Sequence, residues 1–388
     1  MSGFGTSSWD MVPVDEVLSF VGGSQPPAST FKSESEEGYV RLVQIRDFYT
    51  SAHLTYVPDS NLLRKCGVND VMIARYGVSV GRVLKGLEGA YNVALVKATP
   101  KDGIDNGFLF YLLSSDYFQL PLLAQSARSA QAGFSRESIG YINLPRPPLG
   151  VQKSMAEALG ALDDKIESNR RVVKKSELLL LAHSNSLSYL PTVALSEVSK
   201  SYRRPVNPLV LGDEWVDHFS LPAFDAAAMP ERCQASSIMS GKFGIETTSV
   251  LISRLNPGTP RVWCAHVREV PAMCSSEFLV LEPLHESSVG ALWLAAVHPT
   301  LGEQMVQRAT GTSFSHQRIK SDDALSVEVP DIRLIDEQTR VECDELIEMV
   351  GKRRSETEHL SRLRDALLPE LLSGRLRVKD AESMMENV

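Results

Sequence analysis

The 388-residue sequence lacks the features that mark several classes of protein. Its five cysteines are scattered and include no Cys-x-x-Cys pair, which excludes a disulfide framework and indicates no zinc site. No apolar run approaches the ~18 residues of a membrane span, and the N-terminus has neither the basic nor the apolar segment of a secretory signal. We therefore expect a cytoplasmic protein with reduced thiols and no contact with a membrane.

An excess of positive charge and the common catalytic motifs are missing too. Forty basic and 48 acidic residues give a net charge of −8, which argues against a free-standing, non-specific nucleic-acid binder. There is no GxxxxGK[ST] phosphate loop, no GxGxxG after a strand and no HExxH metal motif. We expect a non-catalytic chain that binds no metal or cofactor. Any contact with DNA must come from local clusters of charge or from a partner.

The most informative feature is an internal repeat with an offset of about 180 residues. Val71–Arg75 matches Val250–Arg254, and Arg82 matches Arg261 at the same offset of 179. Further matches occur in the same order along both copies, at Trp9–Val17 with Tyr189–Val198, Phe134-Ser135 with Phe314-Ser315, and Leu144-Pro145 with Val329-Pro330. Because chance rarely produces several ordered matches, we interpret the chain as a duplication.

Each copy divides into a globule and a helix. Short β-rich runs such as Val71–Ala74 and Val250–Ser253, followed by helical stretches at Phe108–Gln125 and Val289–Val306, predict an α/β globule. The predicted domains are a globule over 1–148, a central helix over 149–188, a second globule over 189–330, and a final helix and tail over 331–388. The fold class is α/β, with two globules in a tandem pseudo-repeat separated by two long helices.

The helices carry the pattern of a coiled coil. Apolar residues recur in the first helix with spacings of three and four and then of seven, at Leu159, Leu162, Ile166, Val173 and Leu180. The second helix has a weaker apolar set that includes Leu346, Leu360, Leu363 and Leu367. We expect these side chains to pack the two helices against each other as an antiparallel pair. Asp163-Asp164-Lys165 is interpreted as surface charge on the first helix.

The order of these motifs resembles one protein family. Ile73–Arg82 in the first globule, Asn143–Leu149 with Gln152 at the first helix, Leu162–Ile166 inside it, and Leu363–Leu376 at the end are similar to the specificity (S) subunit of type I restriction-modification systems. The resemblance covers nearly the whole chain. The second copy departs from the pattern because Gly258 is its only counterpart to the Gly77 and Gly81 pair.

The resemblance implies a non-catalytic reader of double-stranded DNA. Each globule would be a target-recognition domain for one half of a split, asymmetric site, and the helices would hold the two domains apart. The helices would also dock methyltransferase subunits, two in number, and restriction (motor-nuclease) subunits would join that complex. S-adenosylmethionine would bind to the methyltransferase partner and not to this chain.

Candidate DNA contacts are the polar residues of turns and loops that match between the copies, since arginine can bond guanine or phosphate. In the first globule they are Arg75, Gly77, Ser79, Arg82, Ser129, Gln131, Ser135 and Arg136. In the second they are Arg254, Arg261, Thr312, Ser313, His316, Gln317 and Arg318. The alternative interpretation is that they are solvated charges and connecting loops.

Two other functions stay open from the sequence. The chain could be a coiled-coil adaptor whose globules bind proteins, or the recognition subunit of another phage-defence methylation system. Binding of one bipartite DNA sequence with a steep salt dependence would separate a DNA reader from an adaptor.

Overall fold

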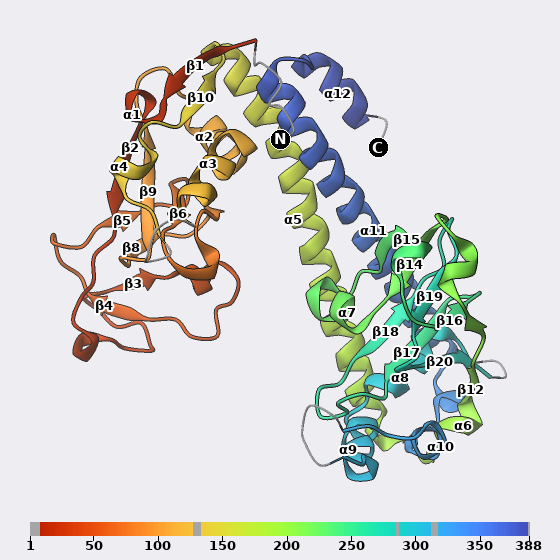
Figure 1. Ribbon diagram of the computed structural model, residues 1–388. Coiled ribbons are helices and arrows are strands. Elements are labelled where there is room, and N and C mark those ends of the chain that lie inside the picture. The colour runs from red at the N-terminus through yellow and green to blue at the C-terminus, as the bar shows by residue number, and fades with distance from the viewer. Residues whose placement is uncertain (1–7, 127–132, 285–286, 312–316, 387–388) are drawn as a thin grey trace. The chain divides into compact units, whose positions relative to one another are not determined.

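The computed structural model describes residues 8–126, 133–284, 287–311 and 317–386, and the chain forms two compact units. Unit 1 comprises Met1–Asp164 and Leu360–Val388, and unit 2 comprises Lys165–His359. Two long helices, α5 (Leu149–Ser186) and α11 (Glu337–Ser373), each contribute residues to both units (Figure 1).

The globule of unit 1 is built on two four-stranded sheets. The first has the order β2-β9-β6-β7, with the bounds Leu18–Gly22, Leu95–Pro100, Val71–Ala74 and Val83–Leu84. The second has the order β4-β3-β8-β5, with the bounds Tyr56–Pro58, Tyr39–Val43, Gly89–Tyr91 and Lys65–Cys66. All four residues of β6 are buried, as the continuous apolar run predicts.

Helices follow the sheets in unit 1. Helix α2 (Asn106–Ser114) begins where the Asp105 carboxylate accepts a hydrogen bond from the backbone N–H of Phe108 at 3.0 Å, and α3 (Asp116–Ser126) comes next. Strand β1 (Asp10–Pro13) pairs antiparallel with β10 (Asn143–Arg146), which joins the start of the globule to its end.

The globule of unit 2 repeats this plan. Its first sheet has the order β12-β20-β17-β18, with the bounds Ser199–Tyr202, Phe278–Pro283, Ser249–Ser253 and Val262–Ala265. Its second sheet has five strands in the order β13-β16-β19-β14-β15, with the bounds Pro205–Val206, Lys242–Ile245, Ala272–Ser275, Trp215–Phe219 and Glu231–Gln234. Strand β11 (Thr192–Ala194) pairs with β21 (Glu328–Pro330), as β1 pairs with β10. The predicted α/β tandem repeat is thus confirmed.

The two helical stretches predicted inside the globules are each divided into two helices in the structure. Residues 108–125 form α2 and α3 with a break at Ser115, whose hydroxyl donates to the carbonyl of Leu112 at 2.6 Å. In unit 2, α8 (Val289–Val297) and α9 (Pro299–Arg308) are separated at His298. This break follows from Pro299, because the residue before a proline is disfavoured in helical conformation.

The long helices run antiparallel within unit 2. The Lys165 ammonium lies 3.2 Å from the Glu356 carboxylate, and the His183 ring lies 3.6 Å from the Glu342 carboxylate. The partner on α11 therefore moves back along the chain as the residue on α5 moves forward. This confirms the predicted antiparallel pair. Within the region 331–388 predicted for the final helix and tail, Ile332–Leu334 forms a separate 3-10 turn and helix α11 begins at Glu337.

The predicted packing residues differ in burial. Those that are buried are Leu159, Leu162, Ile166, Leu180, Leu360 and Leu367, whereas Val173, Leu346 and Leu363 are only partly buried. The polar residues Asn169 and Ser176 continue the buried heptad positions of α5.

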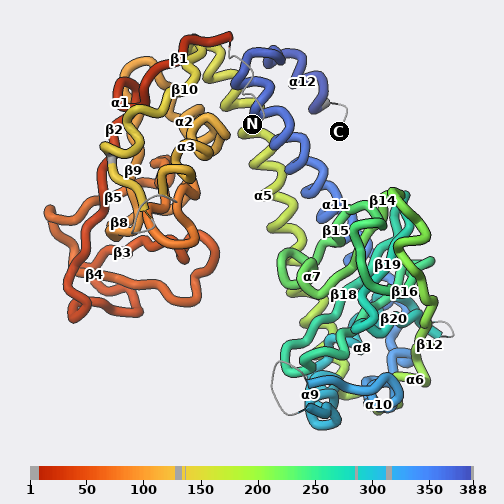
Figure 2. Tube along the Cα trace, in the orientation of Figure 1, coloured from red at the N-terminus to blue at the C-terminus, as the bar shows by residue number. Residues whose placement is uncertain are grey.

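The start of the described chain lies beside the end of α11 in unit 1 (Figure 2). The backbone N–H of Ser8 donates to the carbonyl of Ser373 at 2.9 Å, and a last helix, α12 (Val378–Glu386), follows. In the part of the chain that the structure describes, no helix is long and apolar enough to cross a membrane.

Candidate nucleic-acid interface

The turn between β6 and β7 projects an exposed tip between two arginines. Gly77 and Gly81 have positive φ values of 71° and 85°, a conformation that favours glycine. At Gly81 a Cβ atom would also lie 2.7 Å from a side-chain carbon of Leu122, so a larger residue would have to displace that side chain as well as strain the backbone. Between the glycines, Val78 is fully exposed. The two glycines fix the shape of the turn, and Arg75 and Arg82 flank it.

Arg75 holds a neighbouring loop in place. Its Nε donates a hydrogen bond to the carbonyl of Phe134 at 3.0 Å, and Tyr76 forms a β-bridge with Gly133. Phe134 is buried, as expected of a residue that anchors its loop. The guanidinium of Arg75 is therefore partly committed to the interior of unit 1.

Arg82, in contrast, is exposed. Its Nη1 donates to the hydroxyl of Tyr49 at 3.1 Å, and Tyr49 is itself 60% exposed. Two more polar side chains lie close along the chain, since the amide of Gln44 and the guanidinium of Arg46 both donate to the hydroxyl of Thr55, at 3.1 and 3.3 Å. We call Gln44, Arg46, Tyr49, Thr55 and Arg82 the polar cluster. It offers cationic and neutral donors that suit phosphates and base edges.

The corresponding turn of unit 2 uses asparagine where unit 1 uses glycine. Asn256 lies 179 residues after Gly77 and has a positive φ of 53°, whereas Gly258 has no positive φ. The interpretation of Gly258 as the counterpart was therefore wrong. Asparagine tolerates the left-handed region better than most residues, so the turn is retained without glycine.

Each arginine of the second turn has a partner within unit 2. Arg254 donates from Nη2 to the carbonyl of Ser276 at 2.6 Å. Arg261 makes two bonds to the carboxylate of Asp225, at 2.6 and 2.9 Å, and this hydrogen bonding holds the pKa of Asp225 below its usual range. Arg318 lies 2.9 Å from the carboxylate of Glu277. To contact DNA, Arg261 and Arg318 would either have to release their carboxylate partners or bond to DNA while keeping them.

The other candidates fall into two groups. Among those described, Ser79 lies in the turn, Ser135 accepts and donates bonds with Ser138 in its loop, and the carbonyl of Gln317 accepts a bond from the Asn256 N–H at 2.9 Å. Arg136 begins the short helix α4 (Arg136–Ile139). Ser129, Gln131, Thr312, Ser313 and His316 lie outside the described residues.

Gly77–Gly81 also matches the G-x-S-x-G pattern of serine hydrolases. A nucleophilic serine needs a histidine within hydrogen-bond distance. Within the described ranges, no histidine side chain bonds to Ser79, and no group of His, Cys, Asp and Glu could hold a metal ion. The turn therefore has an exposed tip, but within the described residues Ser79 lacks the histidine partner that a catalytic triad requires.

Comparison with known proteins bears on this interpretation. Residues 6–177 match the model of the type I restriction modification DNA specificity domain. This matched part of the chain, which covers the globule of unit 1 and most of α5, is therefore similar to that specificity domain. The chain is 28% identical over 181 residues to the "Putative type I restriction enzyme MjaX specificity subunit" of Methanocaldococcus jannaschii, which covers 44% of this chain and 40% of the relative. It is 24% identical over 198 residues to the type I restriction enzyme MjaVIII specificity subunit of the same organism, covering 50% and 44%.

These matches span less than half the length of the two curated relatives. The structure is similar over most of its length to the crystal structure of a type I restriction-modification S subunit from M. genitalium, with a TM-score of 0.64 and 13% identity. That likeness covers 96% of this chain and 98% of the other, and it supports the tandem fold.

One junction between the first globule and the long helices was not predicted from the sequence. Asp163 of α5 accepts a hydrogen bond from the Tyr111 hydroxyl at 2.7 Å and another from Nη1 of Arg364 at 2.8 Å. The interpretation of Asp163 as surface charge was therefore wrong, although Asp164 is exposed. Gln152 is a second link to the globule: it is fully buried, and its side-chain oxygen accepts from the N–H of Asp105 at 2.8 Å. The sequence of a helix does not indicate which residue of another element a polar side chain such as Asp163 will contact.

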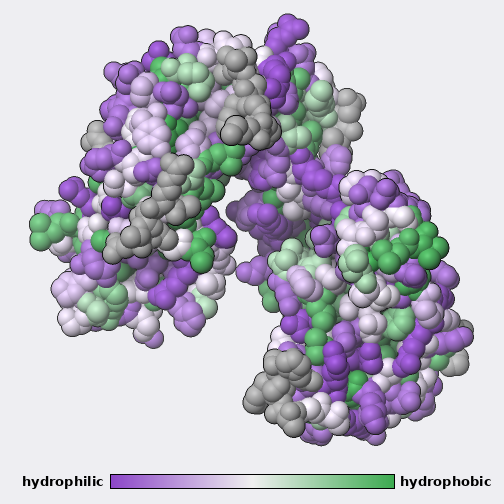
Figure 3. All heavy atoms as spheres, viewed as in Figure 1, coloured by the Kyte–Doolittle hydropathy of each residue, from purple (hydrophilic) through white to green (hydrophobic). Residues whose placement is uncertain are grey.

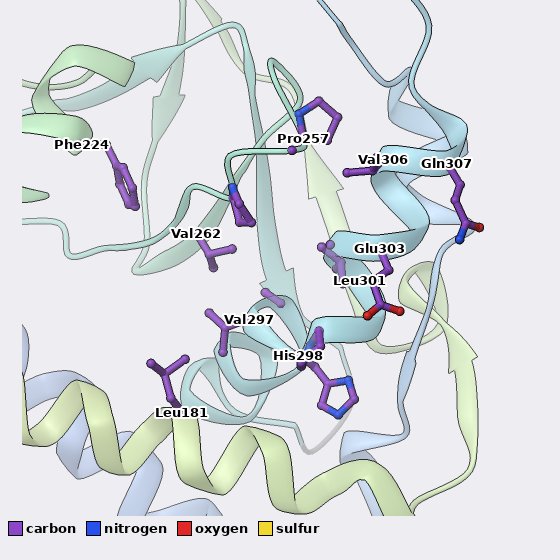
Figure 4. A pocket seen from close by; sticks show the side chains of 15 residues that line it. Leu181, Phe224, Pro257, Val262, Val297, His298, Leu301, Glu303, Val306 and Gln307 are labelled. Carbon is purple, nitrogen blue, oxygen red and sulfur yellow. The ribbon is translucent and has the colours of Figure 1, made fainter. Parts of the chain in front are cut away.

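A pocket of about 700 Å³ lies beside the second turn, within unit 2 (Figure 4). Its lining is mostly apolar and comes from the turn, from α8 and α9, from α7 (Leu221–Ala227) and from α5, with Pro257, Phe224, Val297, Val306 and Leu181 among the residues. Such a lining does not suit a phosphate group. Elsewhere the visible surface carries small apolar patches among hydrophilic residues (Figure 3). The polar cluster is therefore the better candidate for contact with DNA.

Proposed function

We propose that this chain is the DNA-recognition subunit of a type I methylation and restriction complex. Each globule would read one half of a bipartite, asymmetric site in double-stranded DNA, and the chain itself would carry out no reaction. The observation that carries the proposal is the same arginine-flanked turn, between equivalent strands of equivalent sheets, in both globules of a chain that matches the specificity domain over residues 6–177. Such a duplication suits two separate half-sites.

Direct contact with DNA is proposed for the flanking arginines and loops predicted from the sequence. In unit 1, Arg82 and the polar cluster would make the main contacts, with Gly77 and Ser79 in the tip and Arg75 shaping the adjoining loop. In unit 2, Arg254, Arg261, Gln317 and Arg318 occupy the equivalent region. Because the net charge is −8, we infer that partner subunits supply many of the phosphate contacts.

The partners proposed are two methyltransferase subunits, which would bind S-adenosylmethionine, and restriction subunits that join them. The complex would act in the cytoplasm, where DNA and S-adenosylmethionine meet.

In unit 2, Leu178, Leu179 and Leu181 of α5 are more than 40% exposed and would suit docking of a protein partner. Leu178→Lys should therefore weaken co-purification with the methyltransferase subunits. Leu62→Lys is the matched control, because Leu62 is 88% exposed on the first globule, and equal loss in both variants would contradict the docking site.

Methylation mapping tests the recognition function directly. Long-read sequencing of cells with and without this gene should show one bipartite methylated motif that disappears with the gene. Replacing residues 1–148 by the equivalent domain of another family member should change one half of the motif and leave the other half intact. A motif that is unchanged by loss of the gene, or a replacement that alters both halves, would contradict the proposal.

Neither the described structure nor the comparisons favour the protein-binding adaptor or another phage-defence system. The adaptor hypothesis has its own test: an adaptor would leave the methylation pattern of the cell unaltered.

A further inference from the structure

Arg268 joins the second sheet of unit 2 to helix α11. It lies in the connection between β18 and β19, and its Nε donates to Oδ2 of Asp217 on β14 at 2.9 Å. On its other side, Nη1 donates to Oε2 of Glu358 at 2.9 Å and lies 3.4 Å from the hydroxyl of Ser355. Both of these partners belong to α11. A single guanidinium therefore bonds a β-strand and a long helix at the same time.

The carboxylate that receives Arg268 is itself held rigidly. The side chain of Asp217 is 1% exposed, and Arg232 on β15 makes two further bonds to it, at 2.8 and 3.1 Å. Two arginines and two carboxylates thus alternate across β15, β14, the Arg268 loop and α11. Buried charges are tolerated only when they are paired and hydrogen-bonded, so each member restrains its neighbours. We call Arg232, Asp217, Arg268 and Glu358 the ion-pair network of unit 2.

The polar links described in unit 1 come from a different part of the globule. There Tyr111 of α2 bonds Asp163 of α5, and the N–H of Asp105, at the start of α2, bonds Gln152. These links attach the helical layer of the first globule. Unit 2 has comparable links, since the N–H of Gly290 in α8 donates to Asp344 of α11 at 2.7 Å and the Ser184 hydroxyl of α5 donates to the carbonyl of Leu294 at 2.8 Å. In addition, the ion-pair network attaches the sheet β13-β16-β19-β14-β15, which has one strand more than its counterpart in unit 1. The second globule is thus fastened to α11 by a further set of bonds beyond those of its helical layer.

The attachment of the second globule to α11 has a consequence for reading DNA. Moving a half-site by one base pair shifts it by about 3.4 Å along the duplex and rotates it by about 35°. A recognition globule fixed to a helix by charge-assisted bonds cannot follow that rotation without breaking them, whereas a loosely attached globule can.

We propose that Arg268 is a positioning residue that sets how strictly the second half-site must be spaced from the first. The inference rests on the proposed function, since it concerns the orientation of the globule that carries the proposed DNA contacts of unit 2, in which Phe219 of β14 and Trp263 of β18 share one core. Arg268 acts through Glu358 and Ser355, and it need not touch DNA.

The experiment compares spacer lengths. The complex of this chain with its methyltransferase subunits is titrated with duplexes that carry both half-sites of its methylated motif, with the native spacer and with spacers one base pair shorter and longer. The Glu358→Ala, Ser355→Ala double variant frees α11 from Arg268 but leaves the pairing of Asp217 intact. We expect the preference for the native spacer to fall by roughly tenfold, the effect of losing about 1.4 kcal/mol of orienting interaction.

Two variants make the result specific. Glu358→Gln keeps an oxygen that can accept from Arg268 and should recover much of the spacer preference. Glu348→Ala removes a carboxylate from the same helix that pairs with Lys352 of α11 itself, and it should leave the preference unchanged. If the double variant does not fold, Ser355→Ala alone removes only the longer bond and should give a smaller loss of preference.

The failures can be told apart. A purely structural role would weaken binding to all three duplexes by the same factor, and that result would overturn the inference. An unchanged spacer preference in the double variant, with both half-sites still read, overturns it as well. If the wild-type complex prefers no bipartite sequence at all, the proposed function fails and the inference fails with it.

Discussion

The guanidinium carbon of Arg82 lies 5.6 Å from the centre of the Tyr49 ring, and its Nη1 bonds the Tyr49 hydroxyl at 3.1 Å. A neutral aromatic partner orients the guanidinium without neutralising it. The equivalent Arg261 is paired with the carboxylate of Asp225. Of the two equivalent arginines, Arg82 therefore presents its charge more directly to a ligand.

Arg82→Ala should reduce DNA binding by the complex. If Arg82 contacts a phosphate, all sequences should weaken alike and the salt slope should fall by about one; a base contact should cost ~1 to 3 kcal/mol and relax one position of the motif. Titrations at several salt concentrations, combined with methylation mapping, distinguish these results. Arg377→Ala, which alters an arginine near α12 with an 88% exposed side chain, is the control. No change in affinity, slope or motif would place Arg82 outside the interface.

Arg75→Ala should act mainly on stability. It removes the bond from Nε to the carbonyl of Phe134, and a hydrogen bond from a charged group contributes about 1.5 to 3 kcal/mol at most in a partly buried site. We expect thermal unfolding of the Arg75 variant at a lower temperature than that of Arg82→Ala. Equal melting temperatures would mean that the Phe134 loop does not depend on Arg75.

The difference between Arg82 and Arg261 shows how far the sequence could predict this site. The matching strands and flanking arginines are local features, so the repeat predicted an equivalent arginine-flanked turn in both globules. Asp225 lies on α7, in a segment that the repeat does not match, and 36 residues before Arg261. The pairing depends on tertiary folding. The same holds for Asp163, because a heptad pattern predicts which side of α5 is buried but not which polar residues of another element reach its edge.

Ile166→Asp should destabilise the protein strongly. Ile166 is 2% exposed at a heptad position of α5, and an aspartate there would be buried without a partner, at a cost of about 3 to 5 kcal/mol. Leu178→Asp places the same charge on an exposed position of the same helix and should cost far less. Chemical denaturation of both variants gives the comparison. Similar stabilities would be incompatible with a packed seam at Ile166.

Stability of unit 2 should fall in mild acid. Burial, with a smaller effect of Lys242, lowers the pKa of His218 from 6.5 to about 4, and burial also lowers the pKa of His266. Because the folded form disfavours the proton, the unfolded chain binds more protons below pH 6.5. The contribution of His218 is therefore complete above that pH and is lost as the pH falls towards 4, by roughly 3 kcal/mol at full extent.

Denaturation at pH 7.5, 6 and 5 measures this effect. His218→Gln removes the titrating ring, so the variant should lose less stability than the wild type between pH 7.5 and pH 5. An equal loss in both proteins would show that His218 does not control the acid sensitivity.

Gly351→Ala sets two opposing effects against each other. In an exposed helix, replacing glycine by alanine stabilises by about 1 kcal/mol, because glycine loses more backbone freedom on folding. At Gly351 of α11, however, the new Cβ would lie 2.6 Å from Cδ2 and Nε2 of His266. Moving a packed side chain in a buried site costs about 1 to 3 kcal/mol, so we expect a net loss of stability.

Gly160→Ala provides the matched control for this substitution. Gly160 lies inside α5, and the nearest heavy atom to its Cβ would be the Tyr111 hydroxyl oxygen at 3.8 Å, an ordinary contact distance. This variant should therefore gain up to about 1 kcal/mol from helix propensity alone. Thermal unfolding should raise the melting temperature of Gly160→Ala and lower that of Gly351→Ala. If both variants are stabilised equally, the His266 ring can move aside, and the close approach of globule and helix at Gly351 does not require glycine.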